Sequence, residues 1–335
     1  MKIAYLLPST DLSSSVKVAL AQAEALARRG HRVTVVSPDE KPAWFPLLQA
    51  RFERSEFGDA EELAAADVRV ATLWETVRAA LADARGPVFH LCQGYEGELG
   101  VSRDLWPEIE AVYRLPTRKL AVSKPLARRL EDLGFGPVID VGQAFDASEF
   151  PPGPLRPPAD PPIVLVVGPF EAPTRGIPIA LDGLALWRDR GGRFRLRRVS
   201  TLAPTEEERG RGLTAEYHRG LAPGRMPFAY RSADVVIGAS RPEEGFDLPA
   251  LEALSCGVPA LLSDTPGHRD VAGDTAWYFR QGDPESLAAG LPALLSPPAR
   301  ARARSAGPAA ASRCDTASVA ERLEGAFRGA LGGAA

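Results

Sequence analysis

Two glutamates, Glu244 and Glu252, stand eight positions apart around a tight Gly-Phe-Asp-Leu-Pro turn. The turn directly follows an apolar run, DVVIGAS, which is typical of a buried strand. Pro249 fits the first turn of a helix, because an amide at that position has no partner within the helix. Gly257 is well suited to end the helix. The sequence therefore predicts that both carboxylates lie where a strand gives way to a short helix.

The free amides at the start of such a helix favour anions such as a pyrophosphate. Glu252, one turn into the helix, can accept hydrogen bonds from both vicinal hydroxyls of a ribose, as acids do in dinucleotide-binding folds. Glu244 can reach a different part of the same ligand, and Asp247 can cap the helix with its carboxylate. The ordinary alternative makes Glu244 a solvated loop acid and Glu252 an acid favoured by the helix dipole.

The surrounding chain alternates between strand-like and helix-like segments, which implies parallel strands joined by right-handed crossovers. Strands are expected at 2–7, 31–38, 86–97, 119–124, 163–168, 194–200, 233–240 and 258–264, and helices at 16–30 and 176–192. Residues 151–162 contain seven prolines and are expected to form a semi-rigid linker.

The predicted fold class is α/β, with two Rossmann-like domains facing an interdomain cleft. The first domain is expected at 1–150, the linker at 151–162, the second domain at 163–312, and a helical tail at 313–335 that can pack back on the first domain. Ligands of such sheets bind outside the carboxyl ends of the strands.

Composition narrows the class of protein. A chain of 335 residues favours two domains, and 45% hydrophobic with 25% charged residues is typical of globular proteins. A net charge of −3, and no exposed aromatic residues interleaved with the arginines, argue against nucleic-acid binding. The three cysteines lack zinc or CxxC spacing, and no segment has the roughly 20 apolar residues of a membrane span. We expect a soluble, cytoplasmic protein with reduced thiols.

The string from Glu244 to Ala253, followed by Cys256-Gly257-Val258-Pro259, resembles the signature of retaining glycosyltransferases of family 4, which have the GT-B fold. One position departs from the family pattern, because Asp247 stands where the family usually has glycine. Residues 122–152 resemble the family's crossover between domains, and residues 26–38 its first helix and second strand. The resemblance covers nearly the whole chain, most closely over 217–274 and loosely before Ser123.

The resemblance implies that Glu252 binds the donor ribose and that Glu244 faces the donor sugar at the reacting centre. The turn between them would offer backbone N–H groups to sugar hydroxyls and phosphate. Arg175 matches a lysine position of the family's diphosphate clamp and can neutralise a leaving diphosphate, whereas Pro169 replaces the clamp's other basic residue. Otherwise Arg175 is an exposed loop arginine. The implied donor-site residues are Gly168, Arg175, Glu244, Gly245, Phe246, Asp247, Leu248 and Glu252.

In the first domain, FHLCQGYEG lies where the family often carries a histidine near the reacting carbon. His90 is the histidine of this segment, but strand alternation can turn it away from the cleft and make it structural. Gln93 or Glu96, at the end of the strand, then contacts the sugars. Ser13 and Ser14 begin the first helix, where they can present N–H groups to phosphate or act as ordinary helix caps.

The implied activity is transfer of a sugar, with retention and without a metal or other cofactor, from a UDP- or GDP-linked donor to a hydroxyl acceptor. The acceptor would be a glycan, a lipid-linked sugar or a small molecule. The alternatives are a non-catalytic protein of the same fold that binds nucleotide sugar or glycan, and a sugar-nucleotide epimerase.

A basic stretch at 114–130 raises a further expectation. It contains no acid and can contact an anionic membrane surface at the inner face, although a merely solvated face explains it as well. Its basic residues are Arg114, Arg118, Lys119, Lys124, Arg128 and Arg129.

Overall fold

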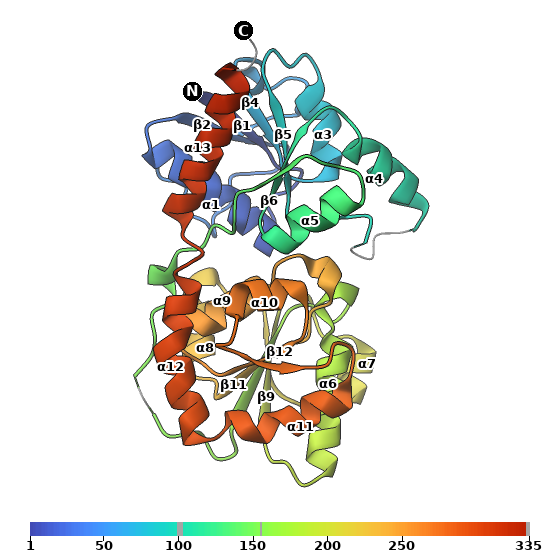
Figure 1. The fold of residues 1–335 in the computed structure, drawn as a ribbon, viewed down its shortest axis with the longest axis vertical. Coiled ribbons are helices and arrows are strands. Elements are labelled where there is room, and N and C mark those ends of the chain that lie inside the picture. The colour runs from blue at the N-terminus through green and yellow to red at the C-terminus, as the bar shows by residue number, and fades with distance from the viewer. Residues whose placement is uncertain (99–102, 155, 333–335) are drawn as a thin grey trace. The chain divides into compact units, whose positions relative to one another are not determined.

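The computed structural model describes residues 1–98, 103–154 and 156–332. The chain divides into two compact units (Figure 1). The first comprises Met1–Phe145 with Cys314–Ala335, and the second comprises Asp146–Arg313. Each unit is a parallel sheet with helices on its faces, so the predicted α/β class is confirmed.

The first unit holds a seven-stranded parallel sheet of order β3-β2-β1-β4-β5-β6-β7. Its strands are β1 (Lys2–Leu6), β2 (Arg32–Ser37), β3 (Arg51–Arg54), β4 (Val68–Ala71), β5 (Val88–Cys92), β6 (Arg118–Ala121) and β7 (Val138–Asp140). Its α-helices are α1 (Ser14–Arg28), α2 (Glu61–Ala64), α3 (Trp74–Leu81), α4 (Trp106–Tyr113), α5 (Lys124–Asp132) and α13 (Thr316–Gly332). The central strands are buried on both faces, and this includes Arg69 in β4 and His90 in β5.

Helix α13 packs along α1 in the first unit, although the whole second unit separates them in sequence (Figure 1). Its apolar face is buried, and the Phe327 ring lies 4.8 Å from the ring of Phe89 in β5. Glu324 of α13 forms an ion pair with Arg29 at 2.6 Å.

The second unit holds a six-stranded parallel sheet of order β10-β9-β8-β11-β12-β13. Its strands are β8 (Ile163–Val167), β9 (Arg195–Ser200), β10 (Thr214–Arg219), β11 (Val235–Gly238), β12 (Ala260–Ser263) and β13 (Trp277–Phe279). Its α-helices are α6 (Ile177–Asp189), α7 (Glu206–Gly210), α8 (Met226–Arg231), α9 (Leu248–Ser255), α10 (Pro266–Ala272), α11 (Pro284–Leu294) and α12 (Pro297–Ala311). The chain first adds β9 and β10 on one side of β8 and then adds β11, β12 and β13 on the other. The strand order therefore reverses between β8 and β11, and ligands of such sheets bind at that point.

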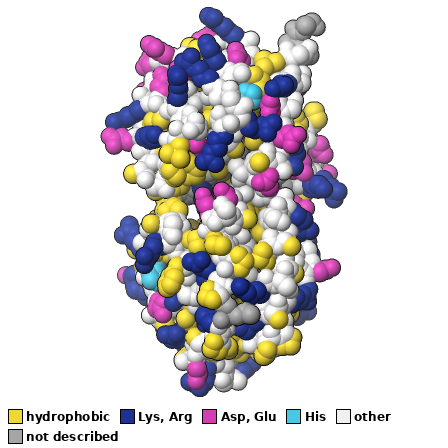
Figure 2. Space-filling model, turned by 90° about the vertical axis from the view of Figure 1, so that its left-hand side faces the viewer, with side chains coloured by type: hydrophobic (Ala, Val, Ile, Leu, Met, Phe, Trp, Pro, Cys, Tyr) yellow, Lys and Arg dark blue, Asp and Glu magenta, His cyan; other side chains and the backbone are white. Residues whose placement is uncertain are grey.

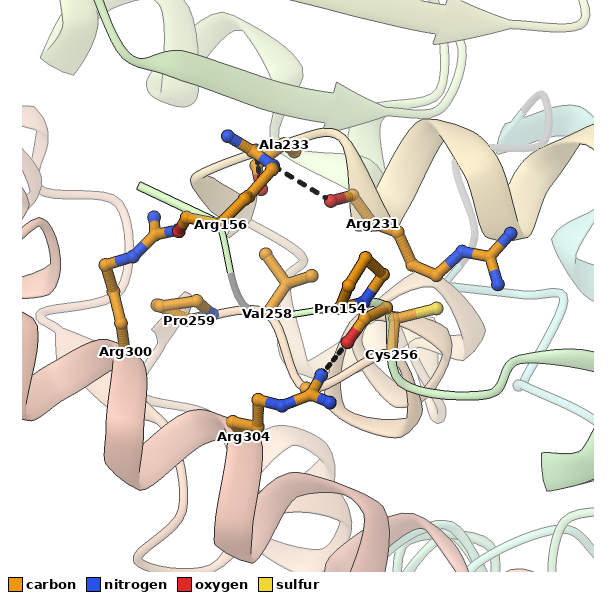
Figure 3. Close-up of a pocket in the computed structure, with 11 residues that line it drawn as sticks. Pro154, Arg156, Arg231, Ala233, Cys256, Val258, Pro259, Arg300 and Arg304 are labelled. Carbon is orange, nitrogen blue, oxygen red and sulfur yellow. Dashed lines mark hydrogen bonds between the residues drawn. The ribbon is translucent and has the colours of Figure 1, made fainter. Parts of the chain in front are cut away.

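The Pro-rich segment 151–162 is held onto the second unit by arginines, at the edge where β8, β11 and β12 begin (Figure 3). The guanidinium of Arg156 donates to the carbonyls of residues 232 and 233 at 2.7 and 3.0 Å. From α12, Arg300 donates to the carbonyl of Arg156 at 3.0 Å, and Arg304 donates to another carbonyl of the segment. The segment is therefore anchored along one unit.

Candidate functional site

Three loops of the second unit meet at the carboxyl ends of β8, β11 and β12. The amide of Arg241, after β11, donates to the carbonyl of Thr174, after β8, at 2.7 Å. Gly176 has φ +61°, and a Cβ there would lie 2.0 Å from the Ala239 carbonyl oxygen. Only glycine permits this backbone conformation and this close approach together. The segment after β12 joins them at Gly267, in the first turn of α10, where a Cβ would lie 3.0 Å from the Gly245 carbonyl oxygen.

Arg175 and Glu244, which the sequence analysis assigns separately to the donor site, lie side by side in this loop cluster. Arg175 Nη2 lies 2.9 Å from Glu244 Oε1, and Nη1 lies 3.1 Å from Asp247 Oδ1. The Thr174 hydroxyl donates to the other oxygen of Glu244. The Arg175 and Glu244 side chains keep 13% and 14% of their surface exposed, against 4% for Asp247. Arg175 and Glu244 are thus the pair that a ligand can reach.

Burial and charge act against each other on this pair. Burial raises the pKa of Glu244, while the positive charge of Arg175 and the Thr174 hydrogen bond lower it, and burial prevails. Burial alone would lower the pKa of Arg175, but the negative charges of Glu244 and Asp247 outweigh it and raise that pKa. Arg175 is therefore a permanent cation at the carboxyl edge of the sheet.

Asp247 has a different role from the helix cap that the sequence predicts. It is the residue before α9, but within the described chain its carboxylate makes no bond to the α9 amides. Instead it accepts hydrogen bonds from His268 Nε2 at 2.9 Å and from the Ser240 hydroxyl at 3.1 Å, besides Arg175. Burial alone would raise its pKa, but the His268 hydrogen bond and the charges of His268 and Arg175 hold that pKa at about 2. Tertiary partners replace the local cap.

Glu252 lies one turn into α9, as the sequence predicts, and is mostly buried. The Tyr230 hydroxyl, from α8, donates to Glu252 Oε2 at 2.7 Å. Burial and the negative charge of Glu252 raise the pKa of Tyr230 well above its usual range, so the phenol stays protonated and remains a donor. This hydrogen bond orients the carboxylate that the sequence analysis assigns to a ribose.

The turn between the two glutamates offers fewer free amides than expected. The Phe246 amide donates to the Glu244 carbonyl at 2.8 Å, and the Gly245 amide donates to the Pro242 carbonyl at 3.3 Å. The side chains of Phe246 and Leu248 are buried. The first backbone hydrogen bond of α9 runs from the Leu251 amide to the carbonyl of residue 247. The amides of the first helical turn therefore have no carbonyl acceptor within the helix.

Gly168 ends β8 beside the Arg175 side chain. Its φ is +125°, and a Cβ there would lie 3.3 Å from Arg175 Cδ. Its carbonyl accepts from Arg198 Nη2 at 2.7 Å, and the fully buried Arg198 is neutralised by Glu208 at 2.6 Å. This ion pair fixes the loop that carries Arg175.

In the first unit, Gln93 and the serines of α1 lie together at the carboxyl end of β5. Gln93 Nε2 donates to the Ser15 carbonyl at 2.9 Å. The Ser13 hydroxyl accepts from the Val16 amide at 3.2 Å, which is an ordinary helix cap, and Ser14 is the first residue of α1. The helix-capping alternative thus describes Ser13.

His90 and Glu96 lie in a buried cluster under Tyr113 of α4. His90 is fully buried, and neither of its ring nitrogens has a hydrogen-bond partner among the described residues. Burial and the charge of Lys119 lower its pKa to about 3, so it is a neutral core residue packed on Tyr113, not a group offered to a ligand. Glu96 is also buried and accepts from the Tyr113 hydroxyl. Burial raises the pKa of Glu96 to about 7 despite that bond.

One of the six basic residues of the stretch 114–130 is buried. Lys119 is only 2% exposed, because it lies within β6, and its ammonium donates to the Thr117 hydroxyl at 2.6 Å. The expectation that Lys119 contacts a membrane is therefore wrong, because β6 belongs to a parallel sheet that is covered on both faces and three of its four residues are buried. The other five basic residues are exposed, with Arg114 paired to Glu110 and Arg129 to Glu98.

The surface offers no broad field of one sign on the face in Figure 2, where Lys and Arg side chains are interspersed with acidic and apolar ones. Among the helices described, none combines the length and apolarity needed to cross a bilayer. Nor do the described residues bring three His, Cys, Asp or Glu side chains together as a metal site would require.

Sequence reasoning missed the polar groups that hold the site together, which are Thr174, Arg198, Tyr230, Ser240, Ser263 and His268. The position of His268 shortly after β12 was a usable signal, because the carboxyl ends of parallel strands lie along the same edge of a sheet.

Comparison with known proteins gives a family match within the second unit. Residues 161–297 match the family described as glycosyl transferases group 1. The GDP-mannose-dependent α-(1-6)-phosphatidylinositol dimannoside mannosyltransferase of Mycobacterium tuberculosis is 31% identical over 131 residues, which is 38% of this chain. The D-inositol 3-phosphate glycosyltransferase of Segniliparus rotundus is 34% identical over 116 residues, or 34% of this chain. The chain spans 34% and 26% of the length of these two relatives.

Solved structures match over the whole chain. Anabaena HepE, in complex with UDP-glucose, superposes with a TM-score of 0.78 and 17% identity over 98% of this chain and 100% of its own. The sucrose-phosphate synthase of Thermosynechococcus elongatus gives a TM-score of 0.79 and 17% identity over 99% of both chains. The fold is GT-B, as the resemblance in the sequence predicts.

Proposed function

We propose that this chain, whose residues 161–297 form a group 1 glycosyl transferase domain within a GT-B fold, transfers a sugar from a nucleotide-diphosphate donor to a hydroxyl acceptor. One observation supports this most directly. Arg175 and Glu244 form an accessible, mutually bonded cation and acid beside the first turn of α9, at the carboxyl edge of the sheet. A diphosphate and a sugar need a cation and a hydrogen-bond acceptor in this arrangement.

The donor proposed is a UDP- or GDP-linked sugar, with no other cofactor. Two similar proteins support these two bases: HepE has been crystallised with UDP-glucose, and the mycobacterial enzyme is GDP-mannose-dependent. Glu252, oriented by Tyr230, accepts hydrogen bonds from the ribose hydroxyls of the donor.

The mechanism proposed is metal-independent and retaining. As the bond to the sugar breaks, negative charge builds on the leaving diphosphate, and the fixed charge of Arg175 with the first-turn amides of α9 stabilises it. Glu244 holds sugar hydroxyls and aligns the reacting carbon. Gly168 and Phe246 to Leu248 shape the backbone that the donor lies against.

The acceptor proposed is a sugar-containing or lipid-linked hydroxyl compound. Gln93, near Ser13 and Ser14, is the candidate for contacting it in the first unit. Arg118, Lys124 and Arg128, which are exposed, together with Arg114 and Arg129, would support peripheral contact with an anionic membrane on the cytoplasmic side.

A thermal-shift panel of UDP, GDP, ADP, CMP and dTDP sugars tests the donor, on wild type and Glu252→Ala. We expect one nucleotide to stabilise the wild type and to lose most of that effect in the variant. A donor-hydrolysis assay then tests turnover, because an active site of this kind transfers some sugar to water. A chain that binds the donor without any hydrolysis or transfer would contradict catalysis.

The second candidate is a non-catalytic protein that binds nucleotide sugar. The bond from Arg175 to Asp247 favours it, because a second acid competes with the diphosphate for the same guanidinium. Turnover by the wild type decides between the two.

A further inference from the structure

His268 lies behind the Arg175 and Glu244 pair, with both ring nitrogens facing acceptors. Its Nε2 lies 2.9 Å from Asp247 Oδ2, and its Nδ1 lies 2.8 Å from the backbone carbonyl of Ser263. The ring is 1% exposed, so water does not supply alternative partners. A carbonyl oxygen accepts hydrogen bonds and never donates them, so Nδ1 carries a hydrogen.

The Ser263 hydroxyl gives no alternative donor to Nδ1. It lies 3.1 Å from Nδ1, but its single hydrogen is directed to the Ser240 carbonyl at 2.5 Å. The hydroxyl therefore presents a lone pair to the ring, which again requires a hydrogen on Nδ1.

Asp247 requires a hydrogen on the other nitrogen. Its Oδ1 accepts from Arg175, and its Oδ2 accepts from the Ser240 hydroxyl at 3.1 Å as well as facing His268. A carboxyl group whose oxygens accept these bonds is ionised, in line with its low pKa. Both nitrogens of His268 are then protonated, and the ring is an imidazolium cation.

The charges of the cluster follow from this assignment. Arg175 and His268 contribute two positive charges, and Glu244 and Asp247 contribute two negative charges. If His268 were neutral, the two acids would outweigh Arg175, and an incoming phosphate would meet a net negative cluster. We propose that His268 is a positioning residue whose positive charge balances Asp247 and so leaves the charge of Arg175 available to an anionic phosphate ligand. This inference rests on the proposed donor site.

The fold supports this role by making no room for other partners. A Cβ at Gly238 would lie 3.0 Å from Asp247 Oδ2 and 3.4 Å from His268 Nε2, so the pair packs directly over the backbone of β11. The Thr265 hydroxyl caps α10 by accepting a hydrogen bond from the His268 amide at 3.3 Å. This bond holds the backbone of His268 in place. The imidazolium is thus held in place before any ligand arrives.

A double-mutant cycle separates the charge of His268 from its shape. His268→Gln removes the positive charge, and Asp247→Asn removes the negative charge that it balances, while amide groups keep hydrogen bonding possible at both positions. With UDP and GDP as probes in calorimetry, we expect H268Q to weaken binding about tenfold. The D247N/H268Q variant, whose net charge equals that of the wild type, should bind within about threefold of it.

A matched control uses an ion pair between Arg269 of the same helix and Asp264, which precedes the helix. Arg269 and Asp264 form an ion pair at 2.7 Å, and both side chains are about half exposed. The variants R269Q and D264N/R269Q should leave nucleotide affinity unchanged. Circular dichroism establishes that each variant is folded.

The charge of His268 can be measured without any ligand. In ¹⁵N-histidine-labelled wild type at neutral pH, both ring nitrogens of His268 should show the shifts of a protonated imidazolium. The assignment comes from the signal lost in H268Q or, if that variant does not fold, in D247N/H268Q.

The outcomes distinguish this inference from the proposed function. A neutral His268 ring in the spectrum overturns it, and so does equal loss of affinity in H268Q and D247N/H268Q, which would indicate a purely structural role. If wild type binds neither nucleotide, the proposed donor site fails, and the spectrum alone then decides whether His268 carries the charge that balances Asp247.

Discussion

Two clusters of arginine and carboxylate side chains lie at opposite ends of the strands in the second unit's sheet. At the edge where β11 begins, Asp234 binds Arg156 at 3.0 Å and Arg300 at 2.9 Å. At the edge where β11 ends, Arg175 binds Glu244 at 2.9 Å and Asp247 at 3.1 Å. The same side-chain types therefore stand at both ends of one strand.

The clusters differ in what occupies their remaining hydrogen-bonding groups. The second oxygen of Asp234 accepts from the amides of Ala159 and Ile163, and Arg156 ends on backbone carbonyls (Figure 3). Asp234 is fully buried, so this cluster holds the Pro-rich segment to the sheet. The exposed fractions of the arginines do not separate the clusters, because Arg156 and Arg300 keep 30% and 17% exposed against 13% for Arg175; the carboxylates do, since Asp234 has no exposed surface and Glu244 keeps 14%. A carboxylate that is closed off by backbone groups supports the fold, whereas one that stays accessible can exchange partners with a ligand.

Breaking the closed cluster should have the largest effect on stability. Asp234→Asn leaves Arg156 and Arg300 without their counter-charge and should lower the free energy of unfolding by about 3–5 kcal/mol. Urea denaturation measures this loss. Nucleotide affinity of the folded fraction should stay within about twofold of the wild type, and a selective loss of affinity with normal stability would contradict the contrast between the two clusters.

The accessible cluster should show the reverse behaviour. Arg175→Gln removes the cation that stabilises the leaving diphosphate and should lower donor turnover by about 10²–10³-fold. Its free energy of unfolding should change much less than that of D234N. Steady-state donor hydrolysis measures turnover, with R269Q, an exposed arginine on α10, as the control. Unchanged turnover in R175Q would exclude Arg175 from catalysis.

The pKa of Asp247 adds a pH dependence at the accessible edge. Its folded pKa of about 2 lies below its usual value of 3.8, so the folded state binds fewer protons than the unfolded state between these values. The stabilisation is therefore complete above pH 3.8 and is lost as pH falls through the folded pKa, by about 2 kcal/mol. Asp247→Asn should remove this part of the acid dependence. Denaturation measured from pH 6 to pH 2 on both proteins tests it, and parallel curves would contradict it.

The smallest effect expected concerns the ribose contact. Glu252→Ala should weaken nucleotide binding about tenfold, and Tyr230→Phe, which removes only the hydrogen bond orienting Glu252, should weaken it about threefold. Calorimetry with the nucleotide selected by the thermal-shift panel measures both. If Y230F bound as the wild type does while E252A did not, Tyr230 would not be needed to orient the carboxylate.

The sequence predicted those site residues whose positions depend on local order. Arg175 and Glu244 lie in the loops that follow β8 and β11, and Glu252 lies in the helix that begins after the second of these loops, so the parallel sheet places them at one edge. His268, Ser240 and Tyr230 reach the same cluster from separate loops and helices, and no local pattern links them.

His90 takes its structural alternative, Lys119 does not reach the surface and Asp247 does not cap α9, and the physical reasons differ. His90 and Lys119 are register partners in β5 and β6, and their side chains point into the core instead of reaching a surface. Asp247 was expected to cap α9, but charged tertiary partners bind it more strongly than the helix amides. Short or charged strands, such as β3 and β10, escaped prediction because they lack a continuous apolar run.

The return of α13 to the first unit has a consequence for synthesis and folding. Residues 146–313 form a complete second unit, and they are translated before the helix that buries Phe89 of the first. The first unit must therefore wait with one side of its core uncovered until the second has been made. Chaperone dependence and sensitivity to truncation should both concentrate in the first unit during this interval.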